Sequence, residues 1–306
     1  PSSARSKTQE KEVLMSSYNK RSSNKLGWTP KWFGVSEFGE MLQKSIKAFQ
    51  QKYVDLKVDG LCGPSTYRRV KLERELNNAK PESGDQIIIG GKPHYIPWDN
   101  VVVPGEDGAL ALTKGFRKKK ERYINMAITH WDVCTSAAKC HRVLAAKNIS
   151  THFCIDWDGT IYQFVDVMHE AWHAGVSKIN RQSVGIDFNN PIYTKYNKIL
   201  TRKGQTERPI IKGYKINGWN PGEFLGFHQI QVDAYVALLA ALNHHLPDFE
   251  LNTPAYLGDP KVIKTIKVDK AVKEGGVMHH AHVKKGKWDT AGVHLKECCE
   301  AAQQLD

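Results

Sequence analysis

The spacing of apolar residues changes along the chain, and the first clear pattern is helical. Between residues 45 and 76, apolar positions such as Ile46 and Phe49 recur at helical spacing and stop at the turn Asp59–Gly60. A second helical pattern starts at Ser65, after a Gly-Pro break. The pattern therefore predicts a compact helical module near the amino-terminal end.

Beyond residue 85, apolar residues form short runs bounded by Gly, Pro and Asn, which is typical of strands. Strands are predicted at 87–103, 124–131, 152–158, 160–167 and 183–188, and helices near 136–147 and at 229–246. Strands that alternate with helices indicate an α/β protein. The predicted fold class is α/β, with a small N-terminal helical module and a C-terminal mixed β-sheet flanked by helices.

Polar stretches divide the chain. Residues 1–24 are rich in Ser, Lys, Arg and Asn and are predicted to form a weakly ordered polar tail or a peripheral helix, and not a core element. A polar Pro/Gly/Ser/Asn-rich linker at 77–86 then separates a helical domain at 25–80 from a larger domain at 81–306, which includes part of this linker. The polar segment 190–226 is long for a loop, so we expect it to carry structure or function of its own.

Composition narrows the class of protein. No apolar run approaches the ~18 residues that span a bilayer, so we expect no transmembrane segment. The formal net charge of +12 favours an anionic partner, such as nucleic acid, anionic lipid or a cell-wall polymer. The basic run from Lys114 to Arg122 is predicted to be the solvated start of a helix, and a dedicated site for a polyanion is the alternative. The first residues contain no secretory signal, so we expect synthesis in a reducing compartment.

The stretch MHEAWHAG at 168–175 contains His169, Glu170 and His173 in the order H-E-x-x-H. A metalloprotease needs this motif on a helix, because only there do both imidazoles share one face with the glutamate beside them. Here the motif follows a predicted strand directly and reaches Gly175 within one helical turn. The pattern therefore argues against an HExxH metalloprotease, which is kept as an alternative.

Within the helical module, AFQ at 48–50 is followed by VDGLCGPST at 58–66. Gly60 and Gly63 suit unusual backbone angles, and Thr66 can cap the following helix. The module resembles the peptidoglycan-binding domain of wall hydrolases, whose signature reads A-V-x-x-F-Q, a short loop and D-G-x-x-G-x-x-T. A generic helical hairpin with a tight turn is the alternative.

The larger domain contains a series of motifs in a fixed order. They are AITH at 127–130, STHF at 150–153 leading to DG at 158–159, AWHAG at 171–175 and VGID at 184–187. In this order they resemble the zinc-dependent N-acetylmuramoyl-L-alanine amidase family, which includes phage endolysins and the peptidoglycan recognition proteins. The resemblance implies that His130 is the first zinc ligand and that His169 and Glu170 are bystanders.

The family's remaining ligands follow the patterns g-H-x-D-h and K-x-D-P-G near its carboxyl end. This sequence offers VMHHAHV at 277–283 and KWDTAG at 287–292. With the two patterns aligned on Val283, the resemblance implies His280 as the second imidazole ligand and Asp289 as the third ligand.

Two departures leave this alignment open. His282 stands where the family usually has Asp, and Thr290-Ala291 replaces its Pro. A shifted register, with His279 or His282 as the ligand, is the alternative.

The resemblance also implies the chemistry. Two imidazoles and one carboxylate leave a fourth Zn²⁺ position open for water, and this zinc-activated water would cleave the amide bond between N-acetylmuramic acid and L-alanine. Asp187, where the family usually has Glu, is implied as the general base, and Lys287 as the cation that stabilises the oxyanion. His152, Trp172 and His173 are implied to contact the substrate.

Cys134 and Cys140 have the spacing of two cysteines that peptidoglycan recognition proteins join in a disulfide. By analogy they are expected to bridge in an oxidising space, and two reduced thiols are the alternative.

Modular organisation and positive charge together resemble a phage endolysin, an antimicrobial enzyme that stays in the host cytoplasm until its release to the bacterial cell wall at lysis. The expected partner is bacterial peptidoglycan, the expected state is a monomer, and no nucleic-acid partner is expected. A bacterial enzyme exported by another route, a recognition protein that binds peptidoglycan without cleaving it, and a nucleic-acid binder are the alternatives.

Overall fold

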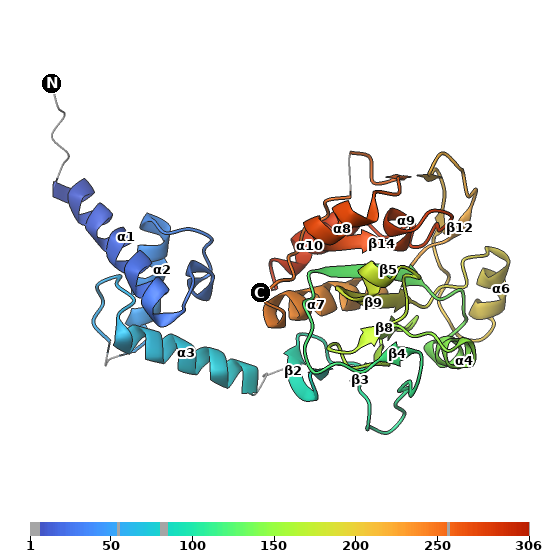
Figure 1. Ribbon diagram of the computed structural model, residues 1–306, viewed down its shortest axis with the longest axis horizontal. Coiled ribbons are helices and arrows are strands. Elements are labelled where there is room, and N and C mark those ends of the chain that lie inside the picture. Colours follow the sequence, from blue (N-terminus) through green and yellow to red (C-terminus); the bar gives the residue numbers. More distant parts are fainter. Residues whose placement is uncertain (1–6, 54–55, 80–84, 256–257, 306) are drawn as a thin grey trace. The chain divides into compact units, whose positions relative to one another are not determined.

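The computed structural model describes residues 7–53, 56–79, 85–255 and 258–305 (Figure 1). The chain forms two compact units, Pro1–Lys80 and Pro81–Asp306. This division coincides with the predicted boundary between the helical and the larger domain. None of the helices in the described ranges combines the length and the apolar character needed to cross a bilayer.

The N-terminal unit is helical, as predicted. It contains α1 (Lys7–Leu26), the short 3₁₀ helix η1 (Pro30–Phe33), α2 (Glu40–Gln51) and α3 (Pro64–Ala79). The buried residues Trp28, Leu42, Ile46 and Cys62 form its main apolar cluster. The two helical patterns read from the sequence correspond to α2 and α3.

Residues 7–24 lie in helix α1, so the helical alternative is the one found, and the expectation of weak order is corrected for this part; residues 1–6 lie outside the described residues. Asn19 is buried, and its side chain donates to the carbonyl of Gly60 and accepts from the N–H of Cys62, both at 2.9 Å. The hydroxyl of Ser22 donates to the carbonyl of Cys62. Helix α1 therefore belongs to the folded unit, and it contacts the rest through polar side chains that leave little apolar periodicity in the sequence.

The residues of the F-Q…D-G motif form one hydrogen-bond network around Gln50, which is 1 % exposed. The side-chain oxygen of Gln50 accepts from the N–H of Asp59 at 3.0 Å and of Gly60 at 2.9 Å. Its amide nitrogen lies 3.1 Å from both Asp59 Oδ1 and Thr66 Oγ1. Gly60 has a φ of +77°, which a residue with a side chain rarely adopts. The motif thus fixes the loop between α2 and α3.

The C-terminal unit is built on a six-stranded mixed sheet in the order β14-β5-β9-β6-β7-β3. Its strands are β3 (Val101–Val102), β5 (Met126–Trp131), β6 (Phe153–Ile155), β7 (Ile161–Gln163), β9 (Ser183–Phe188) and β14 (Gly276–His279). β6 and β7 pair antiparallel, and the other neighbours pair parallel. This confirms the predicted α/β class with a mixed sheet.

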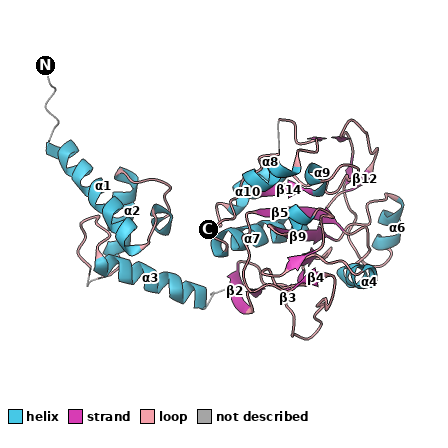
Figure 2. Ribbon diagram, in the orientation of Figure 1, coloured by secondary structure: helices cyan, strands magenta, loops and turns pink. Residues whose placement is uncertain are grey.

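Helices flank this sheet, as predicted (Figure 2). Their bounds are α4 (Ala137–Lys147), α5 (Ser177–Asn180), α6 (Lys195–Thr201), α7 (Gln229–His245), α8 (Val268–Glu274), α9 (His280–Val283) and α10 (Leu295–Ala302). α7 contacts both α10 and β6, α5 contacts α8, and α9 contacts β5 and β14.

Alternate residues of β5 pack into different cores. Ala127 and Trp131 belong to the main apolar cluster, which includes the buried residues of α7 and α10. Met126 and Ile128 belong to a second cluster, with residues of α5, α8 and α9. Because side chains alternate along a strand, His130 lies on the same face as Ile128. The fold therefore directs His130 toward α5 and α9.

Shorter strands pair outside the main sheet. β1 (Asp85–Ile89) pairs with β2 (Lys92–Ile96), β4 (Phe116–Arg117) with β8 (Glu170–Ala171), β10 (Ile210–Ile211) with β12 (Phe224–Leu225), and β11 (Lys215–Ile216) with β13 (Val262–Ile263). β4 corrects the prediction of a helix start in the basic run from Lys114 to Arg122. Its partner β8 is distant in the sequence, so local patterns do not reveal the pairing.

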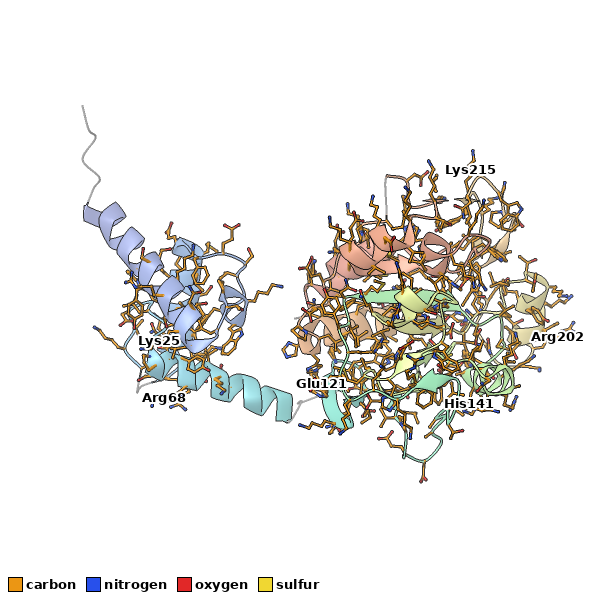
Figure 3. The ribbon with its side chains drawn as sticks, viewed as in Figure 1. Lys25, Arg68, Glu121, His141, Arg202 and Lys215 are labelled. Atoms are coloured by element: carbon orange, nitrogen blue, oxygen red, sulfur yellow. The ribbon has the colours of Figure 1, made fainter. Side chains whose placement is uncertain are left out.

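The segment 190–226 carries structure of its own, as predicted. It contains α6, β10, β11 and β12. Arg202 and Lys215 are exposed on this segment and point outward (Figure 3). They contribute to the positive charge of the surface.

Candidate metal centre

Three ionisable side chains from distant parts of the sequence converge at one edge of the main sheet. His130 lies near the end of β5, His280 begins α9 directly after β14, and Asp289 follows in a loop. β5 and β14 are neighbouring parallel strands, so their carboxyl ends meet at the same edge. All three side chains are buried and can present one ligand atom each to a common point.

The three ligand atoms form a small triangle. His130 Nδ1 lies 3.1 Å from His280 Nδ1 and 3.2 Å from Asp289 Oδ2, and His280 Nδ1 lies 2.9 Å from Asp289 Oδ2. Atoms that each lie about 2 Å from one tetrahedral zinc ion are roughly 3.3 Å apart from one another. The triangle therefore has nearly the size that a tetrahedral ion requires.

His280 directs a lone pair to the centre of this triangle. Its Nε2 lies 3.0 Å from the carbonyl oxygen of Ala174, and since a carbonyl only accepts, Nε2 carries the proton of the neutral ring. Nδ1 is then unprotonated and faces the carboxylate of Asp289, which is also an acceptor. Buried acceptors that converge in this way are stabilised by a cation between them. Two imidazoles and one carboxylate suit zinc and leave its fourth position open.

The structure favours His280 over the neighbouring histidines as the second imidazole of the cluster. His279 Nδ1 lies 2.8 Å from the hydroxyl of Thr290, and His282 Nδ1 accepts from the backbone N–H of His279 at 3.1 Å. Neither ring belongs to the group of convergent ligand atoms found among the described residues. The shifted registers considered from the sequence thus lack a geometric basis.

Burial and neighbouring charges set the protonation of the cluster. Burial is the main cause that lowers the pKa of His130 to about 4, so this imidazole is neutral at pH 7. Burial alone would raise the pKa of Asp289, but the adjacent rings of His130 and His280 lower it below its ordinary value. A neutral imidazole and an ionised carboxylate are the forms that bind a metal ion.

Asp187 and Lys287 lie beside the cluster. Asp187 is the register partner of His130 across β9 and β5 and is 7 % exposed. Burial raises the pKa of Asp187 well above its ordinary value, and the charges of Asp132 and Asp289 raise it further. The positive charge of the exposed Lys287 lowers the pKa of both Asp187 and His130, so this ammonium group acts on the cluster.

The H-E-x-x-H residues do not form a helical metal site. Glu170 lies in strand β8, and His169 Nδ1 lies 3.1 Å from the carbonyl oxygen of Lys119 while its ring stacks on Phe116. His173 instead contacts His130, with His173 Nδ1 at 2.9 Å from His130 Nε2. The two histidines of the motif thus have different surroundings. Only His173 contacts the cluster, as expected if His169 takes no part in metal binding.

The residues expected to contact substrate differ in their exposure. His152 is fully buried: its Nδ1 accepts from the N–H of Gly185 at 2.9 Å, and its Nε2 lies 2.9 Å from the carbonyl oxygen of His169. It connects backbone segments and is not open to a ligand in this structure. Trp172 is 36 % exposed and His173 is half-buried, so both remain accessible.

The sequence interpretation missed the role of Ser183. In β9, Ser183, Gly185 and Asp187 face the same side of the sheet as His130, and apolar residues alternate with them. Ser183 Oγ lies 3.0 Å from His173 Nε2. The period-two alternation in SVGIDF is the signal that could have revealed this polar face.

A second group of potential ligands consists of Asp132, Cys140 and Cys154. The carboxylate of Asp132 already accepts from the N–H of Cys134 at 2.8 Å and of Asn190 at 3.0 Å, so hydrogen bonds satisfy it without an ion. All six cysteines are buried and unbridged, so Cys134 and Cys140 are two reduced thiols in this structure.

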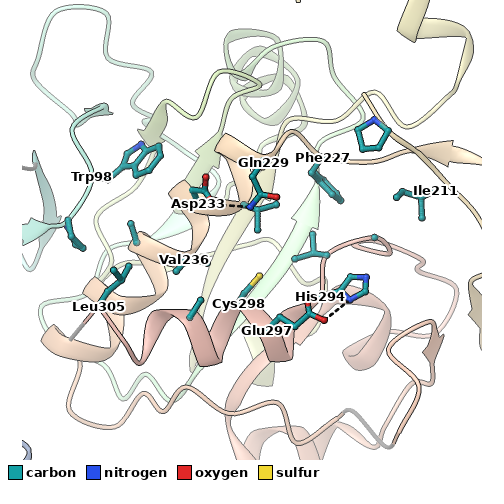
Figure 4. Close-up of a pocket in the computed structure, with 17 residues that line it drawn as sticks. Trp98, Ile211, Phe227, Gln229, Asp233, Val236, His294, Glu297, Cys298 and Leu305 are labelled. Carbon is teal, nitrogen blue, oxygen red and sulfur yellow. Dashed lines mark hydrogen bonds and ion pairs between the residues drawn. The ribbon is translucent and has the colours of Figure 1, made fainter. Parts of the chain in front are cut away.

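A cavity of about 670 Å³ lies on the side of the unit that α7 and α10 cover (Figure 4). Phe227, Val236 and Cys298 contribute to its largely apolar wall. No member of the His/Asp cluster is among the described residues that line it. The candidate metal chemistry therefore does not belong to this cavity.

Comparison with known proteins agrees with the site. Residues 120–292 match the family model described as N-acetylmuramoyl-L-alanine amidase. No curated protein matches the chain.

Three solved structures are similar to part of the chain. The amidase LysC from Clostridium intestinale is 15 % identical, with 65 % of this chain and 94 % of that chain covered and a TM-score of 0.38. The catalytic domain of XlyA is 16 % identical, with coverage of 66 % and 99 % and a TM-score of 0.38. AmpDh3 from Pseudomonas aeruginosa, in complex with anhydromuramic pentapeptide, is 17 % identical, with coverage of 62 % and 64 % and a TM-score of 0.38. At identities of 15–17 % and TM-scores of 0.38, these structures carry no conclusion about function.

Proposed function

Because the chain belongs to the N-acetylmuramoyl-L-alanine amidase family, we propose that it uses a zinc ion to hydrolyse the amide bond between the lactyl group of N-acetylmuramic acid and L-alanine. The observation that carries the proposal is the convergence of His130, His280 and Asp289 around one point. Family membership supports the bond that is cleaved, and the donor set supports the metal.

The role of the metal would be that of a Lewis acid, which polarises the scissile carbonyl and lowers the pKa of a water molecule toward ~7. Asp187 is the group that accepts the proton of the attacking water and returns it to the leaving amine of L-alanine. Burial raises the pKa of Asp187 above the ordinary value of an aspartate, and this makes its carboxylate a stronger base than an ordinary one.

Lys287 supplies positive charge where the carbonyl oxygen becomes an oxyanion. Its influence on the pKa of Asp187 and of His130 supports this position beside the reacting groups. A fixed cation at a developing oxyanion stabilises the transition state more than the ground state, and therefore accelerates the reaction.

The N-terminal unit is proposed to bind peptidoglycan. Support comes from the match of its FQ and DG residues to a wall-binding signature and from the network around Gln50 that orders them. Joining a binding unit to a catalytic unit raises the wall concentration that the active site experiences. This organisation and the formal net charge of +12 support an endolysin role on an anionic wall, with release from the host cytoplasm at lysis.

Purified peptidoglycan provides the test. We expect the full chain to solubilise wall material and to expose new N-terminal L-alanine, to lose this activity after EDTA treatment, and to recover it with zinc. Digestion without new N-terminal L-alanine would contradict the proposed bond. Retention on wall sacculi without any cleavage, in zinc-loaded protein, would instead support a recognition protein.

A further inference from the structure

His173 connects the candidate metal centre to a buried serine on β9. Its Nδ1 lies 2.9 Å from Nε2 of His130, and its Nε2 lies 3.0 Å from the hydroxyl oxygen of Ser183. The hydroxyl of Ser183 lies 2.7 Å from the carbonyl oxygen of Ile179. These contacts form one unbroken chain from a backbone carbonyl to the ring of His130.

The end group of this chain fixes the direction of each hydrogen bond. The carbonyl of Ile179 only accepts, so the single hydroxyl proton of Ser183 points toward it. The oxygen of Ser183 then accepts from Nε2–H of His173, which leaves Nδ1 of that neutral ring without a proton. His173 Nδ1 therefore accepts from Nε2–H of His130. The remaining nitrogen of His130, Nδ1, is left with a bare lone pair that faces the other two residues of the cluster.

The site of His173 is shaped to hold the ring in this place. A Cβ at position 185 would lie 2.5 Å from Cγ of His173, so only glycine leaves room for the ring above β9. Gly185 and Ser183 lie on the same face of β9: Gly185 leaves room for the ring of His173, and Ser183 contacts its Nε2.

We propose that Ser183 and His173 form a positioning pair that holds His130 in the one tautomer able to bind the metal ion through Nδ1. The inference rests on the proposed function, because it requires that His130 is a zinc ligand. His173 acts through His130 and is not itself a ligand in this arrangement. Partners of this kind orient a metal ligand and raise its basicity, and their loss typically weakens metal binding about 10- to 100-fold.

Substitutions along this series of hydrogen bonds separate a positioning role of His173 from simple packing. His173→Leu removes the acceptor for His130 Nε2–H, whereas His173→Asn keeps an amide oxygen that can accept in its place. Ser183→Ala leaves Nε2–H of His173 without an acceptor, which favours the opposite tautomer and a proton on His130 Nδ1. Gly185→Ala displaces the ring of His173 through the added methyl group. Thr160→Val is the matched control, because it deletes a buried hydroxyl that accepts a hydrogen bond from Asn100 at 2.8 Å and that lies outside the chain of contacts from Ile179 to His130.

The measurement is the zinc dissociation constant of the full chain, obtained by competition with a chelator, together with the visible spectrum of the cobalt-substituted protein. We expect about 10- to 100-fold weaker zinc binding in His173→Leu, and weaker binding in the same direction in Ser183→Ala and Gly185→Ala. His173→Asn should lie closer to wild type than His173→Leu does. Thr160→Val should keep the wild-type affinity, and its cobalt spectrum should be unchanged.

The outcomes separate the two proposals. Wild-type protein that binds no zinc would refute the proposed function and this inference together. Wild-type protein that binds zinc, with His173→Leu and Ser183→Ala binding it equally well, would refute the positioning pair alone. Equal weakening in His173→Asn, His173→Leu and Thr160→Val would also contradict it, because packing and not the hydrogen bond would then control the affinity.

Discussion

Asp187 lies beside the metal cluster without belonging to it, so its removal separates catalysis from metal binding. Asp187→Asn keeps the size of the side chain but removes the proton acceptor. We expect kcat to fall by about 10²–10⁴-fold, since this is the usual contribution of a general base, while zinc content stays at the wild-type level. The release of N-terminal L-alanine and a metal analysis of the same sample check this. Activity within about tenfold of wild type would show that another group takes the proton.

Lys287 offers a second test at the scale of one residue. Lys287→Met removes the charge beside the reacting groups, and we expect kcat to fall by about 10²–10³-fold, as for other groups that stabilise an oxyanion. Lys285→Met is the control. Lys285 is an exposed lysine in the same loop, and its charge does not account for the shifted pKa of His130 or of Asp187. Equal effects of the two substitutions on kcat would contradict a specific role for Lys287.

Single residues also show what motif order can and cannot predict. Motif order located His130, His280 and Asp289, which the structure brings together. It did not reveal that His152 is fully buried, because a motif records residue type and spacing but not the packing around a side chain. Ser183 was missed because a lone serine in an apolar strand has no motif, and its partner His173 comes from another segment.

Among the elements, α1 gives the clearest test of the N-terminal unit. Asn19→Ala leaves the carbonyl of Gly60 and the N–H of Cys62 without their partner, and we expect a loss of about 1–3 kcal/mol in the free energy of unfolding of this unit. Lys20→Ala, on the exposed side of the same helix, should change it little. Hydrogen exchange of the full chain, followed by mass spectrometry, measures the unit separately. Equal protection in both variants and wild type would mean that α1 contributes no stability.

The elements that the sequence predicts well are those rich in buried apolar residues. Helix α2 shows them at helical spacing, whereas β5, β9 and α7 stand out as largely apolar segments. Helix α1 buries Asn19 and Ser22, and polar contacts leave no such trace. β4 was missed for another reason, since it exists only through its pairing with the distant β8.

At the scale of the whole molecule, the histidines are distributed unequally between the two units. Residues 1–80 contain no histidine. Burial lowers the pKa of His130 and of His282 to about 4 and the pKa of His152, His173 and His279 well below the ordinary value. Between pH 6.5 and about 4 the unfolded state therefore binds more protons than the folded state, so stability falls as the pH falls through this window.

We therefore expect the metal-free C-terminal unit to lose stability when the pH is lowered from 7 to 5, because histidines of the unfolded chain titrate in roughly this range. The raised pKa values of Asp132 and Asp187 act in the opposite direction, but the buried histidines are more numerous. Hydrogen exchange of EDTA-treated full chain, corrected for intrinsic rates, provides the measurement, and the N-terminal unit is the internal control. Parallel changes in both units would contradict the assignment to histidine.

The most direct test of the central claim is a zinc determination on purified protein. Wild-type chain and His141→Ala, which removes a half-exposed histidine outside the cluster, should each hold one zinc ion per chain, as a single triangle of ligand atoms requires. His130→Ala, His280→Ala and Asp289→Ala should each lose it. Zinc retained at the wild-type level in all three variants, or absent from wild-type protein supplied with zinc, would contradict the account.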